Sequence, residues 1–241
     1  MIQLKTTILD VSEISKSYKK KQVLQESSFD VSKGSCIVFC GGNGAGKSTI
    51  IKIVTGIEKP STGKVTYHTT KKKKFGYMPD QMVFPKEQTP IEILSYYGSF
   101  LGSTKEQINE VIQKVGLWNE RNQKVGSFSK GMSQRVNLAQ CLLADADIYI
   151  LDEPTNGLDP YWVIIFKQII NELKSQGKTV ILSSHIMRDI VDIADEVLLL
   201  FKGKICGKGN LEELYSHFSC SSLEDIFLLL HEQNTKLPVS I

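Results

Sequence analysis

The chain has 241 residues, of which 41% are hydrophobic and 23% are charged, and its formal net charge is +3. This is ample material for a core, in one large domain or in one domain with an inserted subdomain. The positive charge is too mild to indicate nucleic-acid binding, which usually shows a stronger, clustered excess. No apolar run approaches the roughly 18 residues that span a bilayer, and Met1–Asp10 lacks the apolar region of a signal peptide. We therefore expect a cytoplasmic protein that meets a membrane only through a partner.

Five cysteines are spread along the chain without paired metal-ligand spacing: Cys36, Cys40, Cys141, Cys206 and Cys220. Four of them stand among apolar or strand-like residues. We expect reduced thiols that pack as small hydrophobic side chains, rather than a disulfide framework or a zinc site.

The first part of the chain predicts strands followed by one helix. Residues 7–32 read as strands broken by a lysine turn at Lys19–Lys21, and residues 35–40 read as a strand buried on both faces. A glycine-rich loop comes next. A helix is then predicted from Lys47 to about Thr55.

A turn at Pro60–Gly63 leads into a predicted hairpin. Its strands are Lys64–Tyr67 and Lys74–Met78, with the lysine run Lys71–Lys74 at the tip or entering the second strand. Phosphate or anionic lipid is one possible contact for these lysines. A solvated loop tip is favoured because a short basic run is a weak motif.

Residues 90–145 change to helical spacing, which predicts a mostly helical insert. The apolar positions that recur are Ile91, Ile93, Leu94 and Tyr97, then Ile108, Val111, Ile112 and Val115. Strand-like runs return afterwards, at Ile148–Leu151, Thr179–Leu182 and Glu196–Leu200. Because helical segments separate these runs, they predict a parallel sheet covered on both faces. Serine before acids at Ser222–Leu230 predicts the start of a terminal helix.

The glycine-rich loop reads Gly-Gly-Asn-Gly-Ala-Gly-Lys-Ser and matches the full phosphate-loop pattern between an apolar strand and a helix. Glycines allow a tight turn that points N–H groups at phosphate oxygens, and the helix N-terminus adds partial positive charge. Lys47 can reach the β- and γ-phosphates, and Ser48 can ligate Mg²⁺. The residues expected to contact a nucleoside triphosphate are Gly41, Gly42, Asn43, Gly44, Ala45, Gly46, Lys47, Ser48 and Thr49.

A second apolar strand, Ile148–Leu151, ends in two carboxylates. Asp152 is the candidate that holds Mg²⁺ directly or through water, because it stands at the carboxyl end of the strand. Glu153 lies one residue beyond, where it can polarise the attacking water as a general base. A helix cap is the structural alternative for this acidic pair, and it is weak beside a phosphate loop.

A polar turn at Phe128–Arg135, reading Phe-Ser-Lys-Gly-Met-Ser-Gln-Arg, opens a helix, with Ser129 or Ser133 as its cap. This segment resembles the signature motif of ABC ATPases, usually written LSGGQ, and it precedes the Asp152–Glu153 strand at the family's spacing. Phe128, Lys130 and Met132 depart from that pattern. This variant looks like those of bacterial exporter-type subunits.

Further segments resemble the same family, in order along the chain. Asn156–Asp159 resembles the D-loop, His185 resembles the switch histidine, and Tyr18 resembles the A-loop aromatic that stacks on adenine. The resemblance covers essentially the whole chain. It implies an α/β fold of the P-loop NTPase (RecA-like) type, with a mainly parallel sheet, an antiparallel β subdomain and an inserted helical subdomain.

The resemblance also implies one ABC ATPase domain over residues 1–241. Its core and β subdomain would comprise residues 1–89 and 144–241, and the helical signature subdomain residues 90–143. Two such domains, identical or similar, would bind head to tail around MgATP. Ser129 and Gly131 would then touch the γ-phosphate across the interface, Asp159 would join the nucleotide contacts, and His185 would hold the γ-phosphate in cis.

The segment Phe75–Pro79 aligns with the strand before the family's Q-loop, so the glutamine is due at position 80, but Asp80 stands there and Gln81 follows. Either Asp80 or Gln81 would contact Mg²⁺ or water, and Asp80 is slightly favoured. The segment Met82–Thr89 would line a groove for the coupling helix of a membrane permease.

The sequence suggests three candidate functions. The leading hypothesis is the ATP-hydrolysing subunit of an ABC transporter, which would lie peripherally on the inner face of the membrane through a separate permease. The exporter-like variants of its motifs favour export. The alternative is a non-transport ABC ATPase acting on ribosomes or DNA, which usually needs two ATPase domains or a long coiled coil. An unrelated P-loop kinase is disfavoured by the signature, D-loop and switch histidine. We expect no nucleic-acid partner, and the transported substrate stays open.

Overall fold

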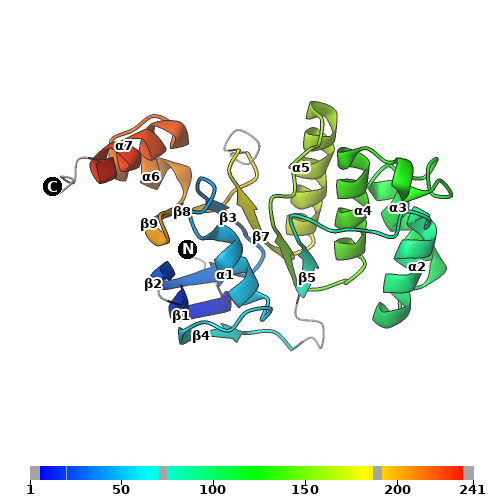
Figure 1. The fold of residues 1–241 in the computed structure, drawn as a ribbon, viewed down its shortest axis with the longest axis horizontal. Helices are drawn as coiled ribbons and strands as arrows, with labels where there is room; N and C mark the ends of the chain where they lie inside the picture. The colour runs from blue at the N-terminus through cyan, green and yellow to red at the C-terminus, as the bar shows by residue number, and fades with distance from the viewer. Residues whose placement is uncertain (1–5, 20, 71–74, 187–191, 236–241) are drawn as a thin grey trace.

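The computed structural model describes residues 6–19, 21–70, 75–186 and 192–235. These residues form a six-stranded sheet, a three-stranded sheet and helices on both sides of the larger sheet (Figure 1). The helices α2, α3 and α4 lie together at one end of the molecule, and α6 and α7 lie at the other. Among the described residues, no helix is long and apolar enough to cross a membrane.

The six-stranded sheet has the order β5-β6-β7-β3-β8-β9. Its strands are β3 (Cys36–Cys40), β5 (Phe75–Met78), β6 (Ile148–Leu151), β7 (Thr179–Ser184), β8 (Glu196–Phe201) and β9 (Lys204–Gly209). Neighbouring strands are parallel except for β9, which runs antiparallel to β8. Every residue of β3, β6 and β7 is buried, which explains their unbroken apolar runs.

The three-stranded sheet is antiparallel and has the order β2-β1-β4. Its strands are β1 (Thr7–Tyr18), β2 (Lys21–Ser32) and β4 (Thr62–Tyr67). The predicted hairpin is therefore wrong, because β4 pairs with β1 whereas β5 pairs with β6 in the other sheet. The short strand β5 buries Gly76 and Met78 against α4 and β6, a cover that the smaller sheet does not offer. The lysine run at residues 71–74 lies outside the described residues.

Alternate residues of the larger sheet point into two different cores. Along β3, Cys36, Val38 and Cys40 join one cluster, and Ile37 and Phe39 join the other. The second cluster packs α1 (Lys47–Val54) and the smaller sheet against one face. The first packs α4 (Lys130–Leu142), α5 (Pro160–Ser175), α6 (Leu211–Phe218) and α7 (Leu223–Thr235) against the opposite face. The prediction of a parallel sheet covered on both faces is confirmed.

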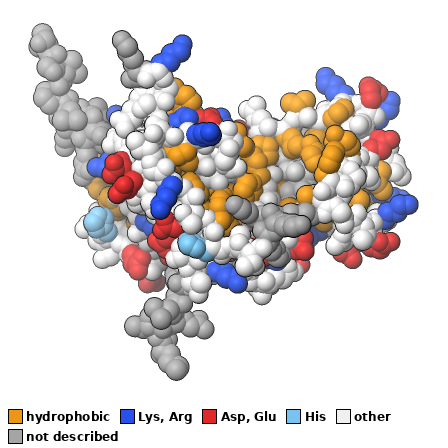
Figure 2. Space-filling model, turned by 90° about the horizontal axis from the view of Figure 1, so that it is seen from below, with side chains coloured by type: hydrophobic (Ala, Val, Ile, Leu, Met, Phe, Trp, Pro, Cys, Tyr) orange, Lys and Arg blue, Asp and Glu red, His pale blue; other side chains and the backbone are white. Residues whose placement is uncertain are grey.

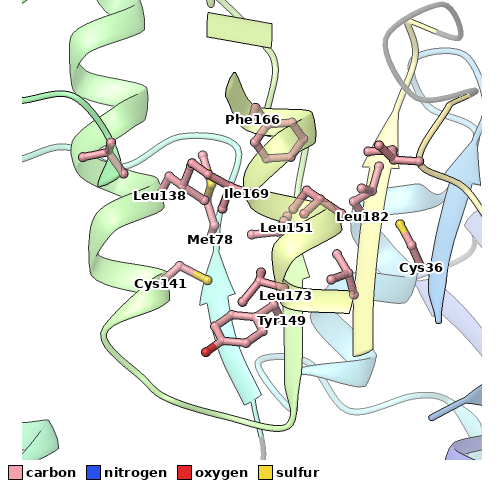
Figure 3. Packing of buried hydrophobic residues seen from close by; sticks show 14 of the residues in the cluster. Cys36, Met78, Leu138, Cys141, Tyr149, Leu151, Phe166, Ile169, Leu173 and Leu182 are labelled. Carbon is pink, nitrogen blue, oxygen red and sulfur yellow. The ribbon is translucent and has the colours of Figure 1, made fainter. Parts of the chain in front are cut away.

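The helical part consists of α2 (Pro90–Leu101), α3 (Lys105–Lys114), a short 3₁₀ turn (Val125–Ser127) and α4. It joins the sheet through one packed layer, in which Leu138 and Cys141 of α4 face Met78 and Tyr149 of the sheet (Figure 3). Of the two candidate caps of α4, the structure selects Ser129, whose Oγ accepts from the Met132 amide at 3.1 Å.

The cysteines lie as predicted for packed thiols. Cys36, Cys40 and Cys141 are buried, Cys206 and Cys220 are half-buried, and all five are free. Burial raises the pKa of Cys36 and of Cys40 to about 12. These buried thiols therefore stay protonated and act as small hydrophobic side chains.

Candidate functional site: a phosphate-loop hollow and a separate signature hollow

A hollow of about 740 Å³ opens at the carboxyl ends of the parallel strands. Its floor is the loop between β3 and α1, which is where a doubly covered parallel sheet binds ligands. The residues that line it are Lys21, Gln22, Val23, Gly42, Asn43, Gly44, Ala45, Gly46, Lys47, Ser48, Thr49, Asp80, Glu153, Asn156, His185 and Lys202. The structure thus brings the phosphate loop together with Asp80, Glu153 and His185, which come from three other parts of the chain.

Two glycines are essential to the course of the phosphate loop. Gly46 has φ 107°, a left-handed conformation that glycine adopts without steric cost, and it leads directly into α1. Gly41 passes so close to β8 that a Cβ would lie 2.5 Å from the carbonyl oxygen of Leu200. The loop therefore curls tightly over the strand end and presents its remaining backbone to the hollow.

Lys47 begins α1 and is only 5% exposed. Its Nζ donates to the carbonyl oxygens of Gly41 at 2.5 Å and of Gly42 at 3.3 Å, and it lies 3.1 Å from Glu153 Oε1. The ammonium is thus already paired with a carboxylate inside the hollow. An incoming phosphate group would compete with Glu153 for this charge.

Asp152 directly follows β6, and its side chain is buried beside two hydroxyl groups. Its Oδ1 accepts from Ser183 Oγ at 2.5 Å and from Ser48 Oγ at 3.4 Å. Burial raises the pKa of this carboxyl group, against the opposing effect of the two hydroxyl hydrogen bonds. A carboxylate and a phosphate-loop hydroxyl form the all-oxygen donor set that Mg²⁺ prefers, so these residues fit that cation.

Glu153 follows with φ 49°, a left-handed conformation that costs a non-glycine residue on the order of 1–2 kcal/mol. Its amide donates to Ser183 Oγ at 2.9 Å, which holds this backbone turn. Its Oε2 accepts from the His185 amide at 3.2 Å and lies 2.7 Å from His185 Nδ1. The turn therefore aims Glu153 into the hollow, between Lys47 and His185.

The two Q-loop candidates, Asp80 and Gln81, differ in their position relative to the hollow. Asp80 is half-buried and lines the hollow, where its Oδ1 accepts from Asn156 Nδ2 at 3.3 Å. Gln81 is exposed and is absent from the residues that line the hollow. Geometry therefore favours Asp80 as the residue that faces a bound metal or water.

Ser129, Gly131 and Asp159 lie in a second hollow of about 350 Å³. Ser129 caps α4, and Asp159 caps α5 by accepting from the Trp162 amide at 3.0 Å. None of the three lines the phosphate-loop hollow. The structure thus keeps the signature residues apart from the phosphate loop of the same chain.

Tyr18 also lies outside the lining of the phosphate-loop hollow. Its hydroxyl donates to Glu58, a bond that raises the tyrosine pKa to about 12, and the residue is 44% exposed. The Lys16 Nζ sits 5.0 Å from the ring centroid. Lys21 and Gln22, just beyond the β1–β2 turn, line the hollow instead.

Sequence reasoning missed two polar residues that organise this site. Ser183 bridges Asp152 and the Glu153 amide with one hydroxyl, and Asn156 lines the hollow beside Asp80. The signal for Ser183 is its place at the end of β7, which pairs with the strand that carries both acids. The signal for Asn156 is its place just after them, in the segment that resembles the D-loop.

A complete phosphate loop lies between the buried strand β3 and α1, and the Asp152 carboxylate, which follows β6, lies beside its Ser48 hydroxyl. This combination defines a P-loop nucleotide-binding protein. Comparisons with known proteins narrow this class. The family model described as ABC transporter matches residues 24–156.

Two relatives and one solved structure extend the match over most of the chain. The lantibiotic transport ATP-binding protein SrtF of Streptococcus pyogenes is 34% identical over 221 residues, which covers 87% of this chain and 96% of SrtF. The ABC transporter ATP-binding protein NatA of Bacillus subtilis is 34% identical over 225 residues, which covers 87% of this chain and 92% of NatA. A structure of the ATP-binding subunit of an ABC transporter superposes with a TM-score of 0.85 at 28% identity, and the match covers 93% of this chain and 100% of that subunit.

The chain therefore belongs to the ABC transporter family of ATP-binding proteins. It is an ATP-binding, ATP-hydrolysing subunit, and the predicted P-loop NTPase fold is confirmed. The interpretation as an unrelated P-loop kinase is wrong, because both the family model and the relatives are ABC proteins.

Proposed function

We propose that two ATPase subunits, identical or similar, bind head to tail around MgATP and drive transport, in the export direction, through a separate integral membrane permease. The separation of the two hollows carries this proposal. Lys47, Glu153 and His185 stand in one hollow and Ser129 and Gly131 in the other, so a site that combines both sets needs a second chain.

The phosphate-loop hollow would hold the phosphates of ATP. The phosphate-loop backbone and the Lys47 ammonium would bind the β- and γ-phosphates, and the γ-phosphate would displace Glu153 from Lys47. Ser48, Asp152 and Asp80 would hold Mg²⁺, in preference to Gln81. The metal ion supplies charge neutralisation for the phosphates when it is bound.

Glu153, once released from Lys47, would accept the proton of the attacking water as the general base. His185 already lies against the Glu153 carboxylate and would hold the γ-phosphate. Across the interface, Ser129 Oγ, the Gly131 amide and Asp159 of the second chain would complete the shell of donors and contacts. Tyr18, which is exposed near the β1–β2 turn, would stack on adenine.

The permease would dock on the helical end of the molecule. Val83 is 92% exposed and lines a groove of about 260 Å³ between the segment expected to meet a coupling helix and α2, which contributes Tyr96 and Tyr97. Phe100 on the same side of α2 is 71% exposed. Figure 2 shows hydrophobic side chains in the middle of this face and toward its helical side, and exposed apolar patches are typical of interaction surfaces. Docking there would hold the subunit at the inner face of the membrane.

The relatives support transport over a role on ribosomes or DNA. SrtF is a lantibiotic transport protein, and NatA is an ABC transporter protein. We infer the same general role for this chain, with export favoured by the resemblance of its signature variant to exporter-type subunits. A stoichiometric polytopic membrane protein that copurifies from detergent-solubilised membranes would support this role, and recovery with ribosomes would contradict it.

The Glu153→Gln variant tests the shared nucleotide site directly. Without the general base, turnover should fall on the order of 100-fold or more, and MgATP should trap a dimer on size-exclusion chromatography. Glu172→Gln is the matched control, since Glu172 pairs with Lys114 on the surface, away from both hollows. A Glu153→Gln protein that stays monomeric with MgATP and hydrolyses it at the wild-type rate would contradict the proposal.

A further inference from the structure

One face of α4 carries a row of polar side chains that contact the loops at the carboxyl edge of the large sheet. The row is Lys130, Gln134, Asn137 and Gln140, at the three- and four-residue spacing that places side chains on one helix face. Asn137 Nδ2 donates to the Pro79 carbonyl oxygen at 2.7 Å, and Gln140 Nε2 donates to that of Tyr77 at 2.8 Å. Both acceptors belong to the chain segment that ends in Asp80.

The first turn of α4 contacts the other catalytic loop, which follows β6. Gln134 Nε2 donates to the Glu153 carbonyl oxygen at 3.2 Å. Lys130 Nζ donates to Asn156 Oδ1 at 2.8 Å, and Asn156 Nδ2 donates in turn to Asp80 Oδ1 at 3.3 Å. Because the amide accepts at its oxygen and donates at its nitrogen, its orientation is fixed from both sides. A hydrogen-bonded chain thus runs from the signature turn into the phosphate-loop hollow.

The stem of Lys130 fits the same loop. Gly157 has φ 87°, and a Cβ there would lie 2.7 Å from Lys130 Cδ. A Cβ on Gly131 would lie 2.8 Å from the Gly157 carbonyl oxygen. The signature turn and the loop at Asn156 therefore pack closely, with the lysine stem between them. A glycine at position 130, as in the common signature, would provide neither the stem contact nor the donor to Asn156.

We propose that Lys130 is a positioning residue for ATP hydrolysis, acting within its own chain through Asn156 on Asp80. The ammonium fixes and polarises the Asn156 amide, which holds the Asp80 carboxylate toward the metal and water position. The inference rests on the proposed function, in which Asp80 contacts Mg²⁺ or its water. Lys130 lines the signature hollow, whereas Asn156 and Asp80 line the phosphate-loop hollow, so the chain links the two half-sites of one subunit.

Lys130→Met tests this role because methionine keeps an apolar stem against Gly157 and removes the donor. We expect kcat to fall about 10-fold with KM for ATP within about 2-fold, as for a misplaced catalytic contact. The Mg²⁺ concentration for half-maximal activity should rise, and Lys130→Arg should recover most of the activity. Lys114→Met is the matched control, since Lys114 also ties two helices, through Glu172 at 2.7 Å, away from both hollows.

A double mutant separates this pathway from a direct contact with the nucleotide of the opposite subunit. If Lys130 acts through Asn156, Lys130→Met combined with Asn156→Ala should be no slower than the slower single variant. Losses that multiply, or a Lys130→Met enzyme with wild-type kcat and Mg²⁺ dependence, would overturn the proposal. The Mg²⁺ dependence of ATP binding is measured without turnover, so it tests the role of Lys130 independently of hydrolysis. A wild-type chain that fails to hydrolyse ATP would count against the proposed function and not against the role of Lys130.

Discussion

The two hollows of this subunit differ in how their polar groups are satisfied. At the phosphate-loop hollow, Lys47 and the neighbouring Asp152 are buried, and Glu153 is nearly so; each is paired with a charge or a hydroxyl. In the signature hollow, Ser129 and Asp159 are exposed, and their side chains accept from the amides of the helices that they cap. In the first hollow a ligand can replace Glu153 as the partner of Lys47. In the second, the polar groups at the ends of α4 and α5 face outward, where they can contact a ligand held by another chain.

The largest expected effect comes from blocking the signature hollow. Ser129→Arg places a bulky side chain where the partner's γ-phosphate would sit, so ATPase activity should fall at least about 100-fold. ATP binding by the monomer, measured by equilibrium titration, should stay near the wild-type value because Ser129 lies outside the phosphate-loop hollow. Ser99→Arg, on the exposed face of α2, is the control. Equal loss of monomer binding would mean that the two hollows are not independent.

A loss of activity of intermediate size is expected from removing Ser183, which supports the acids at the phosphate-loop hollow. Ser183→Ala removes the hydroxyl that donates to Asp152 and accepts from the Glu153 amide. With both acids less firmly placed, kcat should fall about 10-fold while ATP affinity changes little. Steady-state kinetics will separate these two parameters, with the surface variant Ser175→Ala for comparison. A large rise in KM without a change in kcat would assign Ser183 to nucleotide binding instead.

The difference between the hollows also explains what could be predicted from the sequence. The phosphate loop is a local feature, because the strand, the glycines and Lys47 follow one another along the chain and the pattern alone implies the turn. The apolar runs at Ile148–Leu151 and Thr179–Leu182 likewise predicted buried strands, since they need no knowledge of their neighbours. Local patterns thus recovered the strands β3, β6, β7 and β8 in the middle of the large sheet and the elements that carry the phosphate loop and its two acids.

Features that depend on distant partners could not be predicted in this way. The hairpin prediction failed because sequence adjacency favoured pairing of β4 with β5, whereas burial against α4 draws β5 to the large sheet. The polar row on α4 was missed for the same reason. The role of Asn137 and Gln140 can be recognised only when the carbonyl groups of Pro79, just after β5, and of Tyr77, within β5, are known to lie opposite them.

The smallest expected effect is on stability, and it isolates the buried charge of the phosphate-loop hollow. Burial raises the pKa of Asp152 in the folded protein above its value in the unfolded chain. Between these two values the folded state binds more protons, so this carboxyl group lowers the free energy of unfolding as pH rises through that window. Asp152→Asn should therefore raise the melting temperature of the nucleotide-free protein at neutral pH, and the difference should shrink toward acidic pH.

Mg²⁺ should act on the same group in the opposite direction, because a bound cation stabilises the ionised carboxylate. Adding MgATP should raise the melting temperature of the wild-type protein more than ATP with EDTA does, and Asp152→Asn should lose most of that difference. The exposed Asp192→Asn variant should behave as wild type in both measurements. A destabilising Asp152→Asn variant that keeps the full response to Mg²⁺ would contradict this account. The buried Asp152 carboxylate would then not be the destabilising charge that distinguishes the phosphate-loop hollow from the signature hollow.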